Sequence, residues 1–465
     1  MTRGGAHGYG DPEQACATRM ELCTDDALRR VRAVSARGAR QIAMGGKTVL
    51  SILPDAPFPA TTGLQIRLAT NLRVVRELAD RSLVLWFGDP AAERDLDALA
   101  SACDEAAFAA PPVPYAQFSP SMRVRHRLEF VIDAAARRRG RRYPLSLVYD
   151  EARAEELVRS AARRLDPDFV VLPIWFLHYA PGLAAEGHRV VADAYDVLTD
   201  QTFNLVKTYG RDHPARLPGL IANHLATRAQ ERLCLPACAE VWANSEPQAE
   251  RLRELSPSTR VVVVGNVLDE RAAEPSPPTT ASTIGFISTY GYPPNLAAAR
   301  HLALEVLPRL RRSLPEARLL LAGGGMAPEL SARLGTVPGV EVLGRVADSG
   351  SFMSSCAVMA FPLFFRSGPP LKVVEALARG RPVVVSREVA EALRLTHGRE
   401  ALVARGAADA SRALARLLTD PGLAAGLAAE GRRVFEARFS LTSAIASARK
   451  HSLIGGAHRP DQTES

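Results

Sequence analysis

The chain has 465 residues, which is more than one ordinary domain core holds, so at least two domains are expected. A composition of 47% hydrophobic and 23% charged residues is typical of a soluble globular protein, and no apolar run reaches the roughly 18 to 20 residues that span a bilayer. The formal net charge of +8 favours acidic partners such as phosphates or membrane surfaces, whereas no nucleic-acid motif with interleaved aromatic residues occurs.

Residues 1–45 are polar, rich in Gly and Arg and without clear periodicity, so they are predicted to be a flexible N-terminal extension with at most one helix. Their opening stretch lacks a hydrophobic core segment and is therefore not expected to be a secretory signal. Six cysteines are scattered along the chain without a metal-binding spacing. This distribution favours reduced thiols, a cytoplasmic location and the absence of a metal site.

Residues 46–270 alternate between strand-like and helical segments and are predicted to be an N-terminal Rossmann-like domain. Buried strand runs are expected at 47–57, 82–88, 144–150, 168–174, 188–196, 240–245 and 260–266. Helical periodicity covers 63–80, 150–165 and 219–235. The stretch between 89 and 143 has little pattern and ends in the basic run RRRGRRY at 137–143. That run fits either a solvated helix end or a peripheral contact with anionic lipid.

A break rich in Pro, Ser and Thr at 271–282 predicts a linker, after which the alternation restarts over 283–435. Residues 436–453 are expected to form a C-terminal helix that can cross back to the N-terminal domain, and 454–465 a flexible tail. Short strands that are apolar on both faces indicate parallel sheets covered by helices. The sequence therefore predicts two doubly wound α/β domains facing a central cleft, with ligands bound beyond the carboxyl ends of the strands.

One acidic residue falls on an apolar helix face in the second half of the chain. On a helical wheel Glu375 lies about 40° from Leu371, at the edge of the arc that also holds Val374 and Ala378. A carboxylate on such a face is costly unless something pairs with it. Either Glu375 reaches water at the rim of the arc, or a ligand with hydroxyl groups lies over this helix.

Four segments follow one another along the chain. They are ANSEPQAERLREL…RVVVVGNVLD, PPNLAAARHLALEVLPRLRRSLPEARLLLAGGG, GPPLKVVEALARGRPVVVS and TDPGLAAGLAAEGRRVFEARFS. In order and spacing they resemble glycosyltransferase family four over about residues 47–450, most strongly over 283–440. The resemblance implies a GT-B fold. It also implies that a sugar is transferred from a nucleotide diphosphate donor to an acceptor hydroxyl with retention of anomeric configuration.

The resemblance further implies a donor site around Glu375. The second Glu of the family's Glu-x7-Glu signature maps onto Glu375 and binds the ribose hydroxyls of the donor in relatives, whereas Ser367 replaces the first Glu. A cis-diol suits a half-buried carboxylate as a partner. The loop STYGYPPN at 288–295 lacks the Arg and Lys that often hold the phosphates, so Arg366 or Lys372 is expected to compensate.

Backbone N–H groups and a helix dipole suit the diphosphate just before the Glu375 helix. The candidate donors there are Ser367, Gly368, Leu371 and Lys372. In the N-terminal domain Gly63 replaces the family's double-Gly loop and is expected to permit close approach to a phosphate. Arg67 follows one helical turn later; the alternative is a plain helix start with a solvated arginine.

Two residues of the N-terminal domain are candidates for the catalytic contact with the acceptor. Asp196 lies at a strand end in ADAYDVLTD, where helix capping is the alternative and the more expected role of Asp200. His178, in WFLHYAP, can approach an acceptor hydroxyl, and a structural role is its alternative. The resemblance implies catalysis by positioning and by stabilisation of the leaving diphosphate, so no cofactor and no metal are expected.

Other functions stay open at this point. One is a non-catalytic member of the fold that binds a nucleotide sugar or a partner protein; another is a GT-B epimerase or phosphorylase. The segment AGGGMAP at 322–328 lacks the third Gly of a dinucleotide fingerprint, so a tight turn is expected there. The sequence does not identify the acceptor, for which a saccharide, a lipid-linked saccharide and a small molecule stay open. The protein is expected in the cytoplasm or peripherally at the inner face of the membrane.

Overall fold

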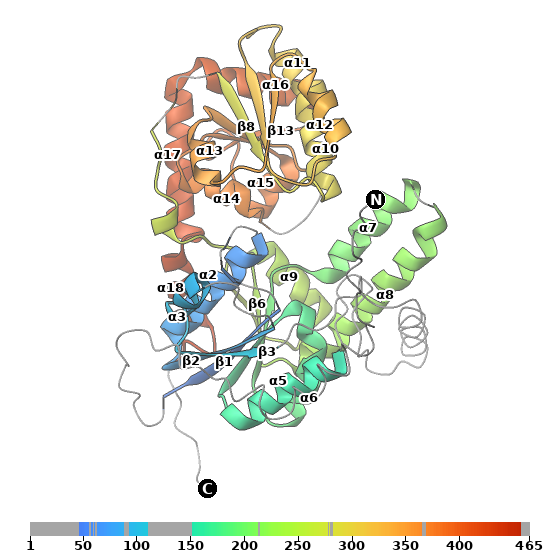
Figure 1. Ribbon diagram of the computed structural model, residues 1–465, viewed down its shortest axis with the longest axis vertical. Coiled ribbons are helices and arrows are strands. Elements are labelled where there is room, and N and C mark those ends of the chain that lie inside the picture. Colours follow the sequence, from blue (N-terminus) through green and yellow to red (C-terminus); the bar gives the residue numbers. More distant parts are fainter. Residues whose placement is uncertain are drawn as a thin grey trace, which may run out of the picture.

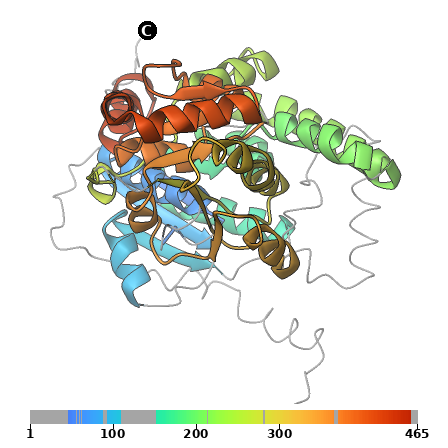
Figure 2. The same ribbon diagram turned by 90° about the horizontal axis from the view of Figure 1, so that it is seen from above.

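Two parallel β-sheets organise the chain, one in each half, and helices pack against both (Figures 1 and 2). The computed structural model describes residues 46–54, 57–58, 60, 63–87, 93–109, 151–212, 214–277, 279, 282–364 and 369–456. Each sheet belongs to a Rossmann-like domain, which confirms the architecture predicted from the alternation of apolar strands and helices. The predictions for residues 1–45, 137–143, 144–150 and 457–465 lie outside the described residues.

The N-terminal sheet has the strand order β3-β2-β1-β4-β5-β6-β7, and all neighbouring strands are parallel. Its strands are β1 (Thr48–Leu53), β2 (Arg81–Phe87), β3 (Glu105–Ala109), β4 (Phe169–Pro173), β5 (Val190–Ala194), β6 (Glu240–Ala243) and β7 (Val261–Val263). The helices around it are α2 (Gly63–Leu78), α3 (Glu93–Ala100), α5 (Glu151–Leu165), α6 (Ala180–Ala185), α7 (Leu198–Asp212), α8 (Leu217–Cys234) and α9 (Glu246–Leu255). The strand order reverses between β1 and β4, which is where such sheets bind ligands.

The C-terminal sheet has the order β10-β9-β8-β11-β12-β13, again with parallel neighbours. Its strands are β8 (Thr283–Ile287), β9 (Arg318–Ala322), β10 (Val340–Gly344), β11 (Val358–Phe361), β12 (Val383–Ser386) and β13 (Leu402–Ala404). Its helices are α10 (Pro293–His301), α11 (Leu307–Leu310), α12 (Pro328–Gly335), α13 (Ser349–Ser354), α14 (Leu371–Ala378), α15 (Arg387–Leu393), α16 (Ala407–Thr419) and α17 (Pro421–Arg438). The switch point here lies between β8 and β11.

The last helix leaves the C-terminal domain and packs on the N-terminal one. Helix α18 (Leu441–His451) lies beside α2 and β7, and its Ala444 and Ala448 are buried in one apolar cluster with Val75 and Trp242 (Figure 1). A short parallel bridge between Leu268 and Ser440 joins the two chain segments that pass between the domains. The two domains are therefore tied together at one side by both crossings of the chain.

The segment between the two domains is held against the C-terminal domain. The buried Arg381 donates to the carbonyl oxygens of Ser276 and, at 2.5 Å, of Pro277. Arg432 Nη1 donates to Ala273 O at 2.8 Å. Because these arginines bind its carbonyl groups, the Pro-rich segment has a defined path where the structure describes it.

Some elements lie where the sequence pattern is weak. Helices α3 and α7 and strand β3 were not expected, and neither were β13 and α16. Strand β3 lies at the edge of the sheet and is built from EAAFA, which offers little apolar periodicity. Helix α7 follows the acidic segment DVLTD and carries exposed polar residues. Both elements depend on tertiary contacts that local propensity does not encode.

Candidate functional site

A half-buried lysine lies at the carboxyl end of β8. Lys372, on the first turn of α14, donates from Nζ to Ser288 Oγ at 2.6 Å and to Asn295 Oδ1 at 2.8 Å. Its Nζ lies 5.5 Å from the centre of the Phe286 ring. Burial lowers the pKa of Lys372 to about 7, so a nearby anion would favour its protonated form. The side chain thus brings a basic group to the loop 288–295, which has none of its own.

The N-cap of α14 is Pro370, and no side chain caps the helix. The N–H groups of Val373 and Val374 donate to Pro370 O. The amides of Leu371 and Lys372 before them suit an anion, in the way that helix N-termini generally do. The three preceding candidates, Arg366, Ser367 and Gly368, lie outside the described residues.

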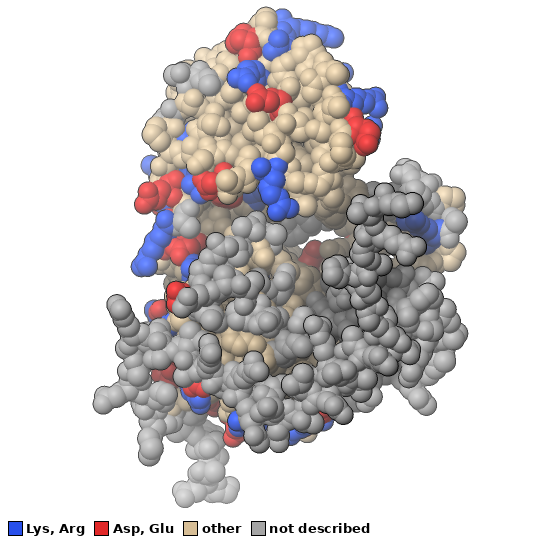
Figure 3. Space-filling view, in the orientation of Figure 1, with Lys and Arg blue, Asp and Glu red and all other residues tan. Residues whose placement is uncertain are grey.

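The first turns of α14 and α2 meet across the boundary between the domains. A Cβ placed on Gly63 would lie 3.7 Å from Leu371 Cδ1, and Ile66 packs against the C-terminal core together with Leu371. Asn266 Nδ2 donates to Pro369 O at 3.1 Å across the same boundary. The structure thus brings Gly63, Leu371 and Lys372 to one place, and Figure 3 shows a hollow between the two domains on this face.

Glu375 has partners within the protein. Its Oε1 accepts a hydrogen bond from Ser349 Oγ at 2.7 Å and lies 3.3 Å from Arg379 Nε, one turn along α14. The carboxylate side chain is 16% exposed, which places it at the rim of the apolar arc as the helical wheel predicts. The sequence analysis considered water and a ligand as partners of Glu375, but not Arg379. The spacing of four residues between Glu375 and Arg379 is typical of an ion pair along a helix and could have indicated it.

The glycine-rich turn after β9 fixes the loop that Lys372 contacts. Gly323 has φ +123°, and a Cβ there would come within 1.8 Å of Ser288 O. Ser288 N donates to Ala322 O at 3.0 Å and Tyr290 N to Gly324 O at 2.8 Å. The prediction of a tight turn is confirmed, because only glycine has both the conformation and the missing side chain that this approach requires.

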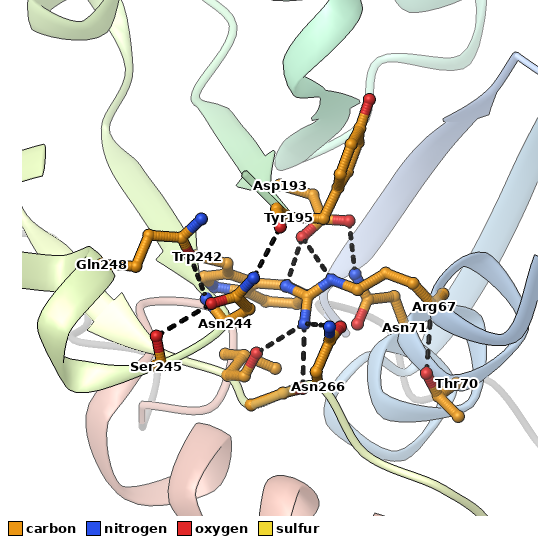
Figure 4. Close-up of polar contacts among 12 residues, drawn as sticks. Arg67, Thr70, Asn71, Asp193, Tyr195, Trp242, Asn244, Ser245, Gln248 and Asn266 are labelled. Atoms are coloured by element: carbon orange, nitrogen blue, oxygen red, sulfur yellow. Dashed lines mark hydrogen bonds and ion pairs between the residues drawn. The ribbon is translucent and has the colours of Figure 1, made fainter. Parts of the chain in front are cut away.

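Arg67 lies inside the N-terminal domain (Figure 4). It is 2% exposed, its Nη2 lies 2.6 Å from Asp193 Oδ1, and its Nη1 donates to Val264 O and Gly265 O at 2.9 Å each. Asp193 also accepts from Asn71 Nδ2 at 2.6 Å. The guanidinium therefore joins β5 to the segment after β7. The sequence predicted that Arg67 either contacts a donor phosphate or is solvated. Its burial inside the N-terminal domain differs from both predictions.

Acidic residues gather where β5 leads into α7. Burial raises the pKa of Asp196 to about 7, and the carboxylates of Glu231 and Asp200 add to the rise. Glu231, 1% exposed on α8, accepts from Leu198 N at 2.9 Å and Thr199 N at 3.0 Å, and so caps α7. Asp200 pairs with Arg251 Nε at 3.0 Å. The cap expected from Asp200 thus comes from a residue 31 positions later, which local sequence does not reveal.

His178 follows β4 in the 3-10 helix Ile174–Tyr179 and is 8% exposed. Its ring centre lies 4.2 Å from that of Tyr179. Burial lowers the pKa of His178 to about 3, so the imidazole is neutral near pH 7. Since β4 and β5 are neighbouring parallel strands, His178 and Asp196 both lie at the carboxyl edge of the N-terminal sheet.

No metal-like cluster occurs in the part of the chain that the structure describes. A search of those residues found no group of three or more His, Cys, Asp or Glu side chains able to hold an ion. The described cysteines, Cys103, Cys234, Cys238 and Cys356, are buried and form no disulfide.

Part of the chain is similar to a known family of enzymes, and most of it is similar to solved structures. Residues 281–420 match the family model for glycosyl transferases group 1. The comparison with curated proteins found no match. Among solved structures, HepE of Anabaena in complex with UDP is 17% identical with a TM-score of 0.55, and 87% of this chain aligns with 98% of it.

Two further solved structures are similar over nearly their whole length. Sucrose-phosphate synthase from Thermosynechococcus elongatus is 14% identical with a TM-score of 0.60, covering 87% of this chain and 98% of that one. A glycosyltransferase from Rickettsia africae is 12% identical with a TM-score of 0.56, covering 87% and 97%. At such low identity these likenesses establish the fold. The chain has the GT-B fold of two Rossmann-like domains, and its C-terminal domain is similar to the group 1 glycosyl transferases.

Proposed function

We propose that the protein is a glycosyltransferase that moves a sugar from a nucleotide diphosphate donor to an acceptor hydroxyl with retention of anomeric configuration. The observation that carries the proposal is the position of Lys372, beside Ser288 at the carboxyl end of β8 and on the uncapped first turn of α14. The domain that holds this lysine is the one that matches glycosyl transferases group 1. HepE, one of the similar structures, was solved with UDP and with UDP-glucose, so uridine donors are the first to test.

In this mechanism the C-terminal domain stabilises the leaving diphosphate. The bond between the anomeric carbon and the phosphate oxygen breaks, and its electron pair goes to the diphosphate. The Lys372 ammonium and the first-turn amides of α14, with Gly368 and Ser367 before them, oppose that negative charge. Glu375 binds the donor ribose, with Arg379 orienting the carboxylate.

The N-terminal domain holds the acceptor on the same face of the sugar. The departing diphosphate oxygen takes the proton of the acceptor hydroxyl as the new carbon–oxygen bond forms, so the protein's own task is positioning. Asp196 and the neutral His178, at the ends of β5 and β4, are the groups proposed to orient that hydroxyl. Gly63, opposite Leu371, permits close approach of the donor phosphates.

No metal is proposed to take part, because a lysine and a helix N-terminus supply the positive charge that a divalent ion otherwise provides. Turnover should therefore be the same in excess EDTA as in magnesium, measured by release of the nucleoside diphosphate. Activity that disappears in EDTA and returns with magnesium or manganese would contradict this part of the proposal.

The decisive experiment is a panel of UDP-, GDP- and ADP-sugars tested by thermal shift and calorimetry, followed by acceptor screening. A hit should bind wild type but bind Lys372→Ala at least about tenfold more weakly, as expected for a charged contact. Lys450→Ala, an exposed lysine on α18, is the matched control. The anomeric proton of the product, measured by NMR, tests retention.

Three results would reject the proposal in different ways. Failure of every nucleotide sugar to bind would remove its basis. Binding without turnover over a broad acceptor panel would assign a non-catalytic binding protein. Conversion of the donor in the absence of any acceptor would assign an epimerase.

A further inference from the structure

A helical arm projects from the N-terminal domain. Helices α7 and α8 form an antiparallel hairpin that extends away from the rest of the molecule (Figures 1 and 2). Thr202 Oγ1 lies 3.2 Å from His224 Nδ1, and the rings of Phe203 and His224 are 5.4 Å apart, so the two helices are joined along the arm. Glu231 fixes its base by capping α7.

An apolar stripe runs along the exposed side of this arm. Ile221, Leu225 and Leu233 are 42%, 57% and 49% exposed, and they follow one another at multiples of four residues on α8. Ala229, also exposed, completes the spacing. Residues four apart lie on one side of a helix, so these side chains form a continuous surface. In the described part of the chain, half of the eight exposed large apolar side chains belong to the arm, Phe203 included.

Basic side chains border the stripe. Arg228 and Arg232 are exposed on α8, and Lys207 is exposed on α7 with its Nζ 4.5 Å from the centre of the Phe203 ring. Figure 3 shows that charges of both signs are dispersed over the C-terminal domain. From residue 201 to 233 the sequence has five basic and two acidic residues, and one of the two acidic residues, Glu231, is buried.

We infer that this arm rests on the surface of an anionic lipid bilayer. An apolar stripe flanked by Arg and Lys is the pattern of helices that lie in a membrane interface, where the apolar side chains enter the headgroup boundary. The α8 helix of 18 residues is about 27 Å long, enough to contact many headgroups. No helix among the described residues is long and apolar enough to cross a membrane, so the contact is one with the surface.

The positive charge of the arm disfavours two other partners for the apolar stripe, which are a second copy of the chain and residues 1–45. A second copy of the chain would bring one basic arm against another, which is unfavourable. Residues 1–45 contain seven basic and five acidic residues, so that segment would also bring net positive charge. An anionic bilayer is the occupant whose charge complements the arm. The inference does not depend on sugar transfer.

The test is cosedimentation of the full chain with vesicles of phosphatidylcholine alone or mixed with phosphatidylglycerol. The wild-type protein should bind only the anionic vesicles. The double variant Ile221→Ser/Leu225→Ser should bind at least about tenfold more weakly, and Arg228→Glu about fivefold or more. Leu304→Ser and Arg333→Glu, at exposed positions of the C-terminal domain, are the matched controls and should bind as wild type does.

Each contrary result overturns the inference. Vesicle binding that is absent in the wild type, or equal in the arm variants and the controls, rejects the arm as the lipid contact. A dimer in solution that the Ile221→Ser/Leu225→Ser variant dissociates would assign the stripe to a second copy. Vesicle binding that appears only in a chain beginning at Met44 would assign the stripe to residues 1–45. Circular dichroism of each variant checks that α8 stays folded.

Discussion

At Lys372 the cost of burying a charge opposes the proposed role of that charge in donor binding. The folded protein lowers the pKa of this amine to about 7 by burial, whereas in the unfolded chain it keeps its proton to about pH 10. Between these values unfolding takes up a proton, so the contribution of Lys372 to stability rises with pH across this window. Below about pH 7 the half-buried Lys372 ammonium is charged in both states and destabilises the fold most.

Replacing Lys372 with Met should therefore stabilise the protein while weakening donor binding. At about pH 7 we expect a gain of about 1 to 3 kcal/mol in the free energy of unfolding, reduced by the lost bonds to Ser288 and Asn295. The gain should shrink as the pH approaches 10. Urea unfolding at the two pH values measures it, and calorimetry with the donor measures the loss of affinity. A variant that is less stable at both pH values would contradict this account of the lysine.

Glu375 is the residue with most weight in the proposed donor site. Its Oε1 is already engaged by Ser349 and Arg379, so a role in binding requires that the carboxylate contact the ribose in addition to them. Glu375→Ala should lower donor affinity by about 2 to 3 kcal/mol, as for a charge-assisted hydrogen bond. Ser349→Ala removes an internal partner alone and serves as the control. If a folded Glu375→Ala protein binds the donor normally, Glu375 has only the structural role of pairing with Arg379.

At the scale of elements, apolar periodicity predicted helices α2, α8 and α14 but missed α7 and α16. Helices α2 and α14 carry regular apolar spacing because one face of each packs on a sheet. Helix α7 was missed because apolar and polar residues are mixed on its exposed side, where Phe203 lies between Gln201 and Lys207. The same property makes the arm noticeable in the structure, since the apolar side chains it does carry are exposed.

Helix α18 provides a test of the crossing between domains. Ala448 is 0% exposed within the apolar cluster on the N-terminal sheet, whereas Ala446, on the opposite side of the same helix, is exposed. Ala448→Asp should destabilise the protein by roughly 3 to 5 kcal/mol because it buries an unpaired charge. Ala446→Asp should change stability by less than about 0.5 kcal/mol. Equal melting temperatures of the two variants would show that α18 does not pack as described.

At the scale of the whole molecule, the first described strand of the N-terminal sheet lies close to the end of the described chain. The described cores start at Val49, and Lys47 Nζ already donates to Ile454 O at 2.9 Å, near the end of the described chain. A chain beginning at Met44 should therefore melt at the same temperature and bind the donor as the full chain does. A chain beginning at Pro54, which lacks β1, should fail to fold. Insolubility or loss of donor binding on starting at Met44 would place residues 1–45 within the fold.

The sequence by itself determined the architecture of the described domains. Parallel strands buried on both faces must be apolar throughout, so β1, β4, β8, β11 and β12 were legible as runs of hydrophobic residues. The helix with Glu375 could also be predicted, because most of its residues are apolar and buried. Neighbouring parallel strands also require a crossover connection, which is usually a helix. The alternation of strands and helices in the sequence therefore predicted the Rossmann-like class.

Only the tertiary structure decided the partners of the charged groups. Arg67 pairs with Asp193, which is 126 residues away in the sequence, and Lys372 donates to Ser288, which is 84 residues away. Glu231 caps α7 from the neighbouring helix. Local periodicity reports which face of an element is buried, because burial depends on many neighbours at once. The partner of one buried charge depends on where a distant segment places a single side chain, and no spacing along the chain encodes that position.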